Sequence, residues 1–244
     1  TKRIKLVYSM TTLAQVLEQL SLAELSNIHM SNSGTGVILG EYMPKVILHI
    51  NEGLLRMFTR IVLAERDVLI EQHDHITNYH LLSRFAAYAN NGSMEPYLYI
   101  RDLPNEKFKD DVIKILKVFD STGARLPLND DNKDNSVFTP QNNVLQIPFP
   151  ETGICVSVLY QAKHPTLTVN DLDKTVELPD GLFECLRAYV AYKVFSAIAT
   201  QEAQAKSQEH YTYFNSLIDE ATTSDSSNTS ISTTNSKFSE RGWI

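Results

Sequence analysis

The sequence has little of several features that define whole classes of protein. It has only two cysteines, Cys155 and Cys185, too few for a disulfide framework, which fits a reducing compartment. No apolar run approaches the roughly 20 residues that a membrane-spanning helix needs. The opening TKRIK is polar and basic, unlike the apolar core of a secretory signal. We therefore expect a soluble protein made inside a cell.

An excess of basic charge is also missing. The chain has 22 Lys and Arg residues against 29 Asp and Glu residues, which gives a net charge of −7. This balance argues against a protein that holds nucleic acid by neutralising its phosphates. It leaves open a surface past which DNA slides without being retained.

Motifs for catalysis or cofactor binding are absent as well. There is no G-x-S-x-G, no P-loop and no cysteine with a nucleophile signature. The glycines of GTGVILG (34–40) lack the spacing of a dinucleotide loop. The acidic stretch DDNKD (130–134) lacks the glycine and the closing glutamate of a calcium-binding loop. We predict no catalytic site, no cofactor and no metal.

One histidine-rich stretch supports an alternative. EQHDHITNYH places His73, His75 and His80 close together, and in a strand the first two would share one face and could grip a metal. No third ligand is placed convincingly, and solvated polar residues are the usual explanation of such a pattern. The alternative function is a soluble metal-binding module, or an enzyme, that uses the His73–His80 region.

Helical patterns occupy both ends of the chain. From Thr11 to Met30, apolar residues recur close to a 3.6-residue period, with Thr11 or Thr12 as the N-cap. A second helix is predicted for 41–63, with Pro44 in its first turn and Gly53 at a kink or a close contact. A stretch without Gly or Pro from Leu182 to Ala221 predicts either one long helix or two helices joined near 200–210.

The middle of the chain is rich in β-branched and aromatic residues. Four short segments read as strands: RDVLIEQ, YLYIRD, VIKILKVFD and ICVSVLYQ. A polar loop is expected from Leu126 to Asn143. The predicted fold is α+β: a helical bundle from residues 1–67 and 179–221, a β-rich insert over 68–178, and an extended C-terminal arm over 222–244.

The C-terminal arm is the most unusual feature. Almost every residue from Thr222 to Ser236 is Ser, Thr or Asn, and the only tryptophan follows at position 243. Such a run buries too little apolar area to fold alone. The anchors of this arm are predicted at its end: Phe238, Arg241, Gly242, Trp243 and Ile244. We predict that they dock on a partner protein; the alternative is that FSERGWI folds back on its own domain.

These features together resemble a known family. The stretch from Leu178 to Glu220, followed by a polar tail that ends KFSERGWI, is similar to the C-terminal part of head-to-tail connector proteins of tailed phages, especially short-tailed ones. These proteins are also called adaptor or head-completion proteins. The segments TLAQVLEQLSLAELSNI and GEYMPKVILHINEGLLRMFTRIVL also fit. The resemblance touches both helical ends and leaves the β-rich middle largely unmatched.

The resemblance implies a structural virion protein. Such adaptors form a ring, commonly of twelve copies, below the portal protein, extend the DNA channel, and present a platform to tail or nozzle proteins. Their C-terminal arms grip the portal, a role that would fall here to residues 222–244. DNA would pass without specific binding, no membrane would be involved, and the protein would be made in the host cytoplasm. Another tail-tube component is the remaining alternative.

Overall fold

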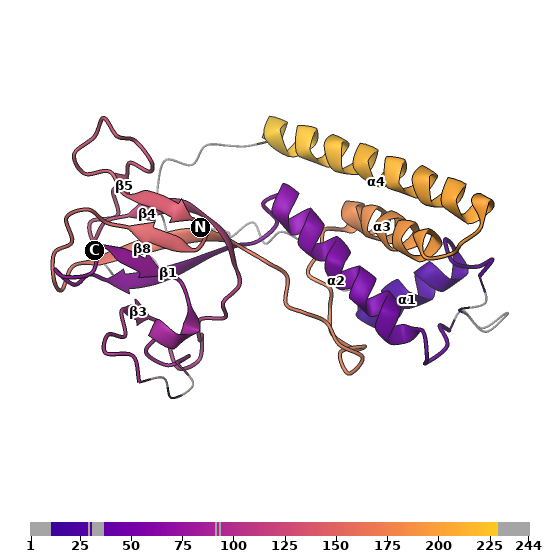
Figure 1. Ribbon diagram of the computed structural model, residues 1–244, viewed down its shortest axis with the longest axis horizontal. Helices are drawn as coiled ribbons and strands as arrows, with labels where there is room; N and C mark the ends of the chain where they lie inside the picture. Colours follow the sequence, from indigo (N-terminus) through magenta and orange to yellow (C-terminus); the bar gives the residue numbers. More distant parts are fainter. Residues whose placement is uncertain (1–10, 29, 31–36, 91, 93, 229–244) are drawn as a thin grey trace, which may run out of the picture. The chain divides into compact units, whose positions relative to one another are not determined.

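The computed structural model describes residues 11–28, 30, 37–90, 92 and 94–228. The chain divides into two compact units, with crossings after Ile61 and after Lys163. We call residues 11–61 with 164–228 the helical unit, and residues 62–163 the β unit (Figure 1). The chain is therefore mixed α+β, as predicted. Both crossings lie earlier in the chain than the predicted positions, 67/68 and 178/179.

Four α-helices belong to the helical unit: α1 (Leu13–Leu22), α2 (Met43–Arg60), α3 (Phe183–Ser196) and α4 (Gln201–Asn228). A 3₁₀ turn, η2 (Asp180–Leu182), leads into α3. Among the helices described, none is both long enough and apolar enough to cross a membrane.

Helix α1 begins as predicted but ends early. Thr12 is its N-cap: the Thr12 side chain accepts from the Gln15 N–H, and the Gln15 side chain accepts from the Thr12 N–H. This reciprocal pair satisfies two backbone donors that a helix start leaves open. The helix was expected to reach Met30, but it ends at Leu22. Turns follow, and they place Leu25 fully inside the core.

Helix α2 carries Pro44 in its first turn, as predicted, and buries one apolar stripe: Val46, Ile47, Ile50, Leu54, Met57 and Phe58. Gly53 is a position of close packing. A Cβ atom there would lie 2.8 Å from Leu186 Cδ1 and 2.9 Å from Tyr189 Cδ1, both on α3. Glycine therefore lets α2 and α3 approach more closely than any other residue would allow.

Helices α3 and α4 form an antiparallel pair (Figure 1). Early residues of α3 meet late residues of α4, as Cys185 does with Phe214, and the end of α3 meets His210 through Phe195. The break between the two helices falls at 197–200, at the very start of the 200–210 segment where a join between two helices was one of the two predictions. The residues that follow Thr200 are therefore the start of α4.

The predicted extended arm is partly helical. Helix α4 continues through Asn228, so residues 222–228 are not extended chain. Thr222 and Thr223 each donate a side-chain hydroxyl to the backbone carbonyl four residues earlier, at 2.8 Å. These bonds satisfy the two hydroxyls within the helix, although hydroxyl bonds of this kind slightly destabilise a helix.

The β unit contains two antiparallel sheets. The larger has the order β3-β1-β8-β4-β5, and the smaller has the order β2-β7-β6. The strands of the larger sheet are β3 (Ile100–Arg101), β1 (Glu65–Glu71), β8 (Cys155–Ala162), β4 (Val112–Phe119) and β5 (Arg125–Leu126). Those of the smaller are β2 (Asn78–His80), β7 (Val144–Gln146) and β6 (Phe138–Gln141), and a 3₁₀ turn, η1 (Ser83–Phe85), follows β2.

All four segments predicted as strands contain strands, but the predicted 126–143 loop is only partly a loop. Its last part forms β6, which pairs with β7. Pro140 within β6 weakened the strand signal, because proline removes a ladder donor. Pro140 is nevertheless tolerated in the sheet, because β6 is an edge strand.

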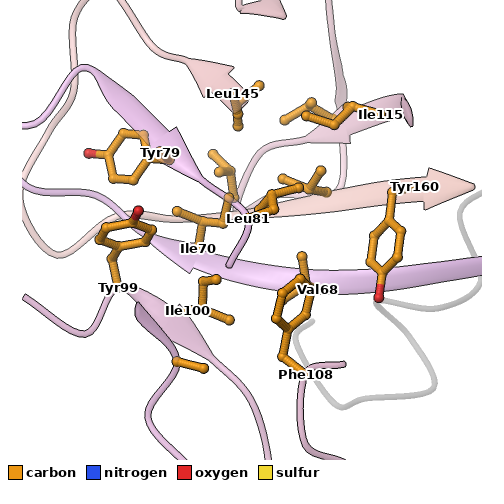
Figure 2. Close-up of a cluster of buried hydrophobic side chains, with 14 of the residues drawn as sticks. Val68, Ile70, Tyr79, Leu81, Tyr99, Ile100, Phe108, Ile115, Leu145 and Tyr160 are labelled. Atoms are coloured by element: carbon orange, nitrogen blue, oxygen red, sulfur yellow. The ribbon is translucent and has the colours of Figure 1, made fainter. Parts of the chain in front are cut away.

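The core of the β unit joins the two sheets. Figure 2 shows Tyr79 and Leu145 from the small sheet facing Ile70 of the large sheet, with Ile100 nearby. The hydroxyls of two of the three buried tyrosines in this cluster bond to the backbone: Tyr79 Oη donates to the His73 carbonyl, and Tyr99 Oη donates to the His80 carbonyl. Burial raises the pKa of both phenols, so they remain neutral donors.

One charged group also anchors the β unit from within. Asp111 is buried and accepts from Arg66 Nη1 at 2.7 Å and from the Tyr160 hydroxyl at 3.0 Å. Burial, together with the Asp111 charge, raises the pKa of Tyr160. This network ties together β1, β8 and the start of β4.

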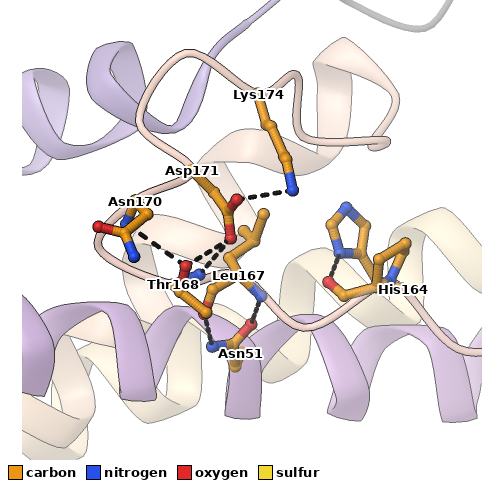
Figure 3. Close-up of polar contacts among 8 residues, drawn as sticks. Asn51, His164, Leu167, Thr168, Asn170, Asp171 and Lys174 are labelled. Atoms are coloured by element: carbon orange, nitrogen blue, oxygen red, sulfur yellow. Dashed lines mark hydrogen bonds and ion pairs between the residues drawn. The ribbon is translucent and has the colours of Figure 1, made fainter.

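The segment from His164 to Leu178 packs on helix α2 and contains a closed turn of its own. Asn51 of α2 forms two hydrogen bonds of 2.9 Å with the backbone N–H and carbonyl of Leu167 (Figure 3). Asp171 then closes a turn by accepting from Thr168 and pairing with Lys174 at 2.6 Å. The Lys174 and Thr168 bonds lower the pKa of Asp171 to about 2.

Candidate interaction surfaces

The predicted docking residues, Phe238, Arg241, Gly242, Trp243 and Ile244, lie outside the described residues. The structure does describe the residue that precedes residues 229–244, because α4 includes Asn228. Sixteen residues, 229–244, follow it in the sequence. A chain of that length spans at most about 50–58 Å when fully extended, so its end can reach a partner well beyond the helix.

His73 and His75 do not lie in a strand, which the metal-binding alternative assumed. Strand β1 ends at Glu71, so His73 and His75 lie on the loop that follows. Their rings are 5.9 Å apart, and both pack against Tyr97. His75 also pairs with Asp74 at 2.9 Å, which lowers the pKa of that carboxyl. His80 lies away on β2, where its ring meets Phe85.

The described residues contain no group of three or more His, Cys, Asp or Glu side chains that could hold a metal ion. The two cysteines are structural. Cys185 is fully buried, and burial raises the pKa of its thiol to about 12; burial also raises the pKa of Cys155. Neither thiol is poised to act as a nucleophile at neutral pH.

The aspartates of the polar loop serve local structure. Asp130 accepts from the Asn132 N–H and pairs with Lys133 at 3.5 Å, and the hydroxyl of Ser136 accepts from the Asp130 N–H. Asp110, at positive φ, accepts two hydrogen bonds from Ser83. These contacts organise turns and leave no converging carboxylates, in agreement with a solvated loop.

Helix α2 presents a surface that the apolar stripe did not predict. Leu48 and Leu55 are seven residues apart on the helix face opposite the core, and they are 54% and 51% exposed. Lys45 and Arg56 are exposed beside them. The seven-residue spacing of the two leucines, out of phase with the core stripe, was the sequence signal for this second apolar line.

A groove of about 420 Å³ adjoins Leu55. Its lining comes from α2 and α3: Glu52, Leu55, Arg56, Thr59, Arg60 and Tyr189. Lys193 Nζ lies 3.0 Å from Glu52 Oε2, and although burial opposes the shift, this bond lowers the pKa of Glu52. Because Glu52 is already paired, the remaining charge at the groove belongs to the two arginines.

Helix α4 presents the opposite charge. Glu202, Glu209, Tyr213 and Glu220 follow one another at intervals of seven, four and seven residues, all exposed, and such spacings place them on one face of a helix. Asp219 is also exposed, next to this face. Two bases lie near this face: Lys206, which pairs with Glu202 at 3.4 Å, and Arg187 of α3, whose charge acts on Tyr213. The acidic face of α4 is the name given below to Glu202, Glu209, Tyr213, Asp219 and Glu220.

Tyr213 is the one large apolar group on the acidic face. It is 43% exposed, and its hydroxyl donates to Glu184 Oε1 at 2.5 Å. That bond raises the pKa of Tyr213 and holds the ring in one orientation. An aromatic ring fixed in this way and flanked by carboxylates has the composition of an interface anchor.

The β unit has a smaller exposed aromatic surface. Phe149, on the loop before β8, is 80% exposed, and Tyr97 is 40% exposed. The loop that follows β1 and the loop that precedes β8 are joined by hydrogen bonds, including Asp74 N–H to Thr152 Oγ1 at 2.9 Å. This end of the sheet is opposite the end where the chain enters β1 and leaves β8.

Comparison of the sequence with known protein families gives a match. The model of one family, described as SU10 adaptor protein, matches residues 79–235. This range contains most of β2, then β3 to β8, α3 and α4. Most of the β-rich middle therefore lies within the similarity, which corrects the expectation that it is largely unmatched; α1, α2, β1 and residues 236–244 lie outside. No curated protein matches the chain.

Proposed function

The chain belongs to the SU10 adaptor protein family, which makes it a phage structural adaptor protein, and we propose that it forms a ring below the portal protein. In this position the ring extends the DNA channel and joins the head to the tail. The observation that carries the proposal is the extent of the family match, which covers most of the β unit together with α3 and α4. A structural role of this kind requires no catalytic site.

The proposed ring gives each surface a task. The helical unit forms contacts between neighbouring copies, twelve in the proposed ring. The β unit presents its loops, including the exposed Phe149, to tail or nozzle proteins. The net charge of −7 suits a channel wall that lets DNA pass without retaining it. The protein is then a virion component at the head–tail interface.

The segment after α4 docks on the portal in this proposal. Its support is the sequence: a polar run that cannot fold alone, followed by Trp243 and Ile244 as apolar anchors. The arm was predicted over 222–244; because α4 includes residues up to Asn228, we assign the docking role in this proposal to residues 229–244. An aromatic anchor on a tether finds its partner over a wide volume and is buried only after docking.

Co-sedimentation with the portal protein tests this function. The full chain is compared with a chain stopped at Asn228, which leaves α4 whole, and with Trp243→Ala; Ser232→Ala is the matched control. We expect the truncated chain to lose portal binding and Trp243→Ala to weaken it at least tenfold. Equal binding by all chains would remove the arm from the portal contact. Binding to a tail-tube protein alone would move the chain to another tail component.

A further inference from the structure

We propose that the acidic face of α4 in one copy packs against α2 of the neighbouring copy, with Tyr213 seated in the groove beside Leu55. This inference rests on the proposed ring and names the two surfaces that close it. One surface is formed by Leu48, Leu55 and the groove, with Arg56 and Arg60 at its edge. The other is the acidic face of α4.

Each of the two surfaces has an apolar part, a groove on one and a protruding ring on the other. Leu48 and Leu55 stand out from α2, and the neighbouring groove of about 420 Å³ has Leu55 and the largely buried Tyr189 in its wall. Tyr213 stands out from α4 and is held by Glu184. An exposed aromatic ring that is already oriented loses little conformational entropy when a groove accepts it.

The charges of the two surfaces are opposite. Arg56 forms no hydrogen bond or ion pair with a described residue, and Glu209 and Glu220 form no ion pair among the same residues. Glu209 lies four residues before Tyr213 and Glu220 lies seven after it, so both carboxylates flank the ring that enters the groove. Arginine at the groove edge then meets carboxylate on either side, which favours one register.

The two surfaces lie on different helices, and this fixes the symmetry of the contact. A contact between unlike surfaces is heterologous, so an open chain of copies keeps one free α2 surface at one end and one free α4 surface at the other until a ring closes. Each copy therefore contributes α2 to one neighbour and α4 to the other. A contact between two α2 faces would instead be two-fold and would stop at a dimer.

Charge reversal tests the contact on the full-length chain. Arg56→Glu and Glu209→Arg are each expected to weaken self-association at least tenfold, measured by sedimentation velocity at low salt and on portal-bearing heads. The chain with both changes regains association, because the opposite charges face each other again. Lys114→Glu, an exposed reversal on β4, is the matched control and leaves association unchanged. Failure of the double variant to recover would overturn the assignment.

Cysteine pairing identifies the faces directly. Chains with Leu55→Cys are mixed with chains with Tyr213→Cys under mild oxidation. We expect a disulfide-linked dimer in the mixture and none from either variant alone beyond the level of the unchanged chain. A linked dimer from Leu55→Cys alone would show that α2 faces itself, and no linkage in the mixture would equally contradict the proposal.

Three further outcomes separate this inference from its premise. If Arg56→Glu assembles on portal-bearing heads as well as the unchanged chain does, the adaptor function stands and the α2–α4 contact is wrong. If hydrogen exchange shows that residues 48–60 lose protection when the chain is stopped at Asn228, but not in Glu209→Arg, the groove holds the C-terminal segment instead. If the unchanged chain neither associates nor binds the portal, both proposals fail.

Discussion

The helical unit and the β unit use polar groups in different ways. The β unit encloses them: Asp111, Tyr79 and Tyr99 are buried and make all their anchoring contacts within the unit. The helical unit also encloses some charge, in Asp171 and in the Glu24–Arg187 pair, but two of its helices carry exposed charges of opposite sign: Lys45 and Arg56 on α2, and Glu202, Glu209 and Glu220 on α4. The anchoring carboxylate of the β unit is therefore satisfied inside the unit, whereas the exposed charges of α2 and α4 face outward from their helices.

The largest expected effect is in the helical core. Phe214 is fully buried between α3 and α4, 5.0 Å from the ring of Tyr189. We expect Phe214→Ala to lower the free energy of unfolding by about 3–5 kcal/mol, because a large cavity forms. Hydrogen exchange should show the loss of protection in the helical unit and not in the β unit. An equal loss in both units would contradict their independence.

The corresponding change in the β unit is at Asp111. We expect Asp111→Ala to cost about 2–3 kcal/mol, less than the loss of a fully buried ion pair, because Arg66 is 32% exposed. Asp111→Asn keeps an acceptor for Tyr160 and should cost less. Chemical denaturation measures both, and a larger cost for the asparagine variant would show that the carboxylate is not the anchor.

Close packing at Gly53 gives a smaller effect of clear sign. Gly53→Ala would improve helix propensity by about 1 kcal/mol, but its Cβ would overlap Leu186 and Tyr189. We expect a net loss of about 1–2 kcal/mol. Gly181→Ala has no atom within 4 Å of the new Cβ and is the matched control in the same unit. If Gly53→Ala stabilises the chain in thermal unfolding, α2 and α3 have room to separate.

The smallest effect depends on pH. Lys174 and Thr168 hold the pKa of Asp171 near 2, below its model-compound value of 3.8, so the stabilisation is complete above about pH 4 and is lost as the pH falls through about 2. Asp171→Asn should therefore unfold at a lower temperature than the unchanged chain at pH 7. Thermal melts from pH 7 to pH 2 should show that difference shrinking, and a constant difference would indicate a role independent of ionisation.

The elements that sequence predicted best have strong local signals. The N-cap, predicted at Thr11 or Thr12 and found at Thr12, and the proline in the first turn of α2 each follow from a few adjacent residues. The four β-branched segments were recognised in the same way. The exceptions are governed by distant contacts: β6 forms only because β7 pairs with it, and Gly53 is explained by α3.

The interaction surfaces were harder to predict for the same reason. Leu48 and Leu55 look like core residues until the core is known to lie on the other side of α2. Glu202, Glu209 and Glu220 form one surface only because α4 is a single continuous helix that starts at Gln201. The docking residues from Phe238 to Ile244 remain a prediction from sequence.

One measurement tests the central claim, that the chain joins a portal to a tail through its C-terminal arm. A photo-cross-linking amino acid replaces Trp243 in otherwise complete phage particles, and the products are identified by mass spectrometry. The adaptor account predicts cross-links from position 243 to the portal protein. Cross-links confined to this chain, whether to the groove beside Leu55 or elsewhere, would contradict it.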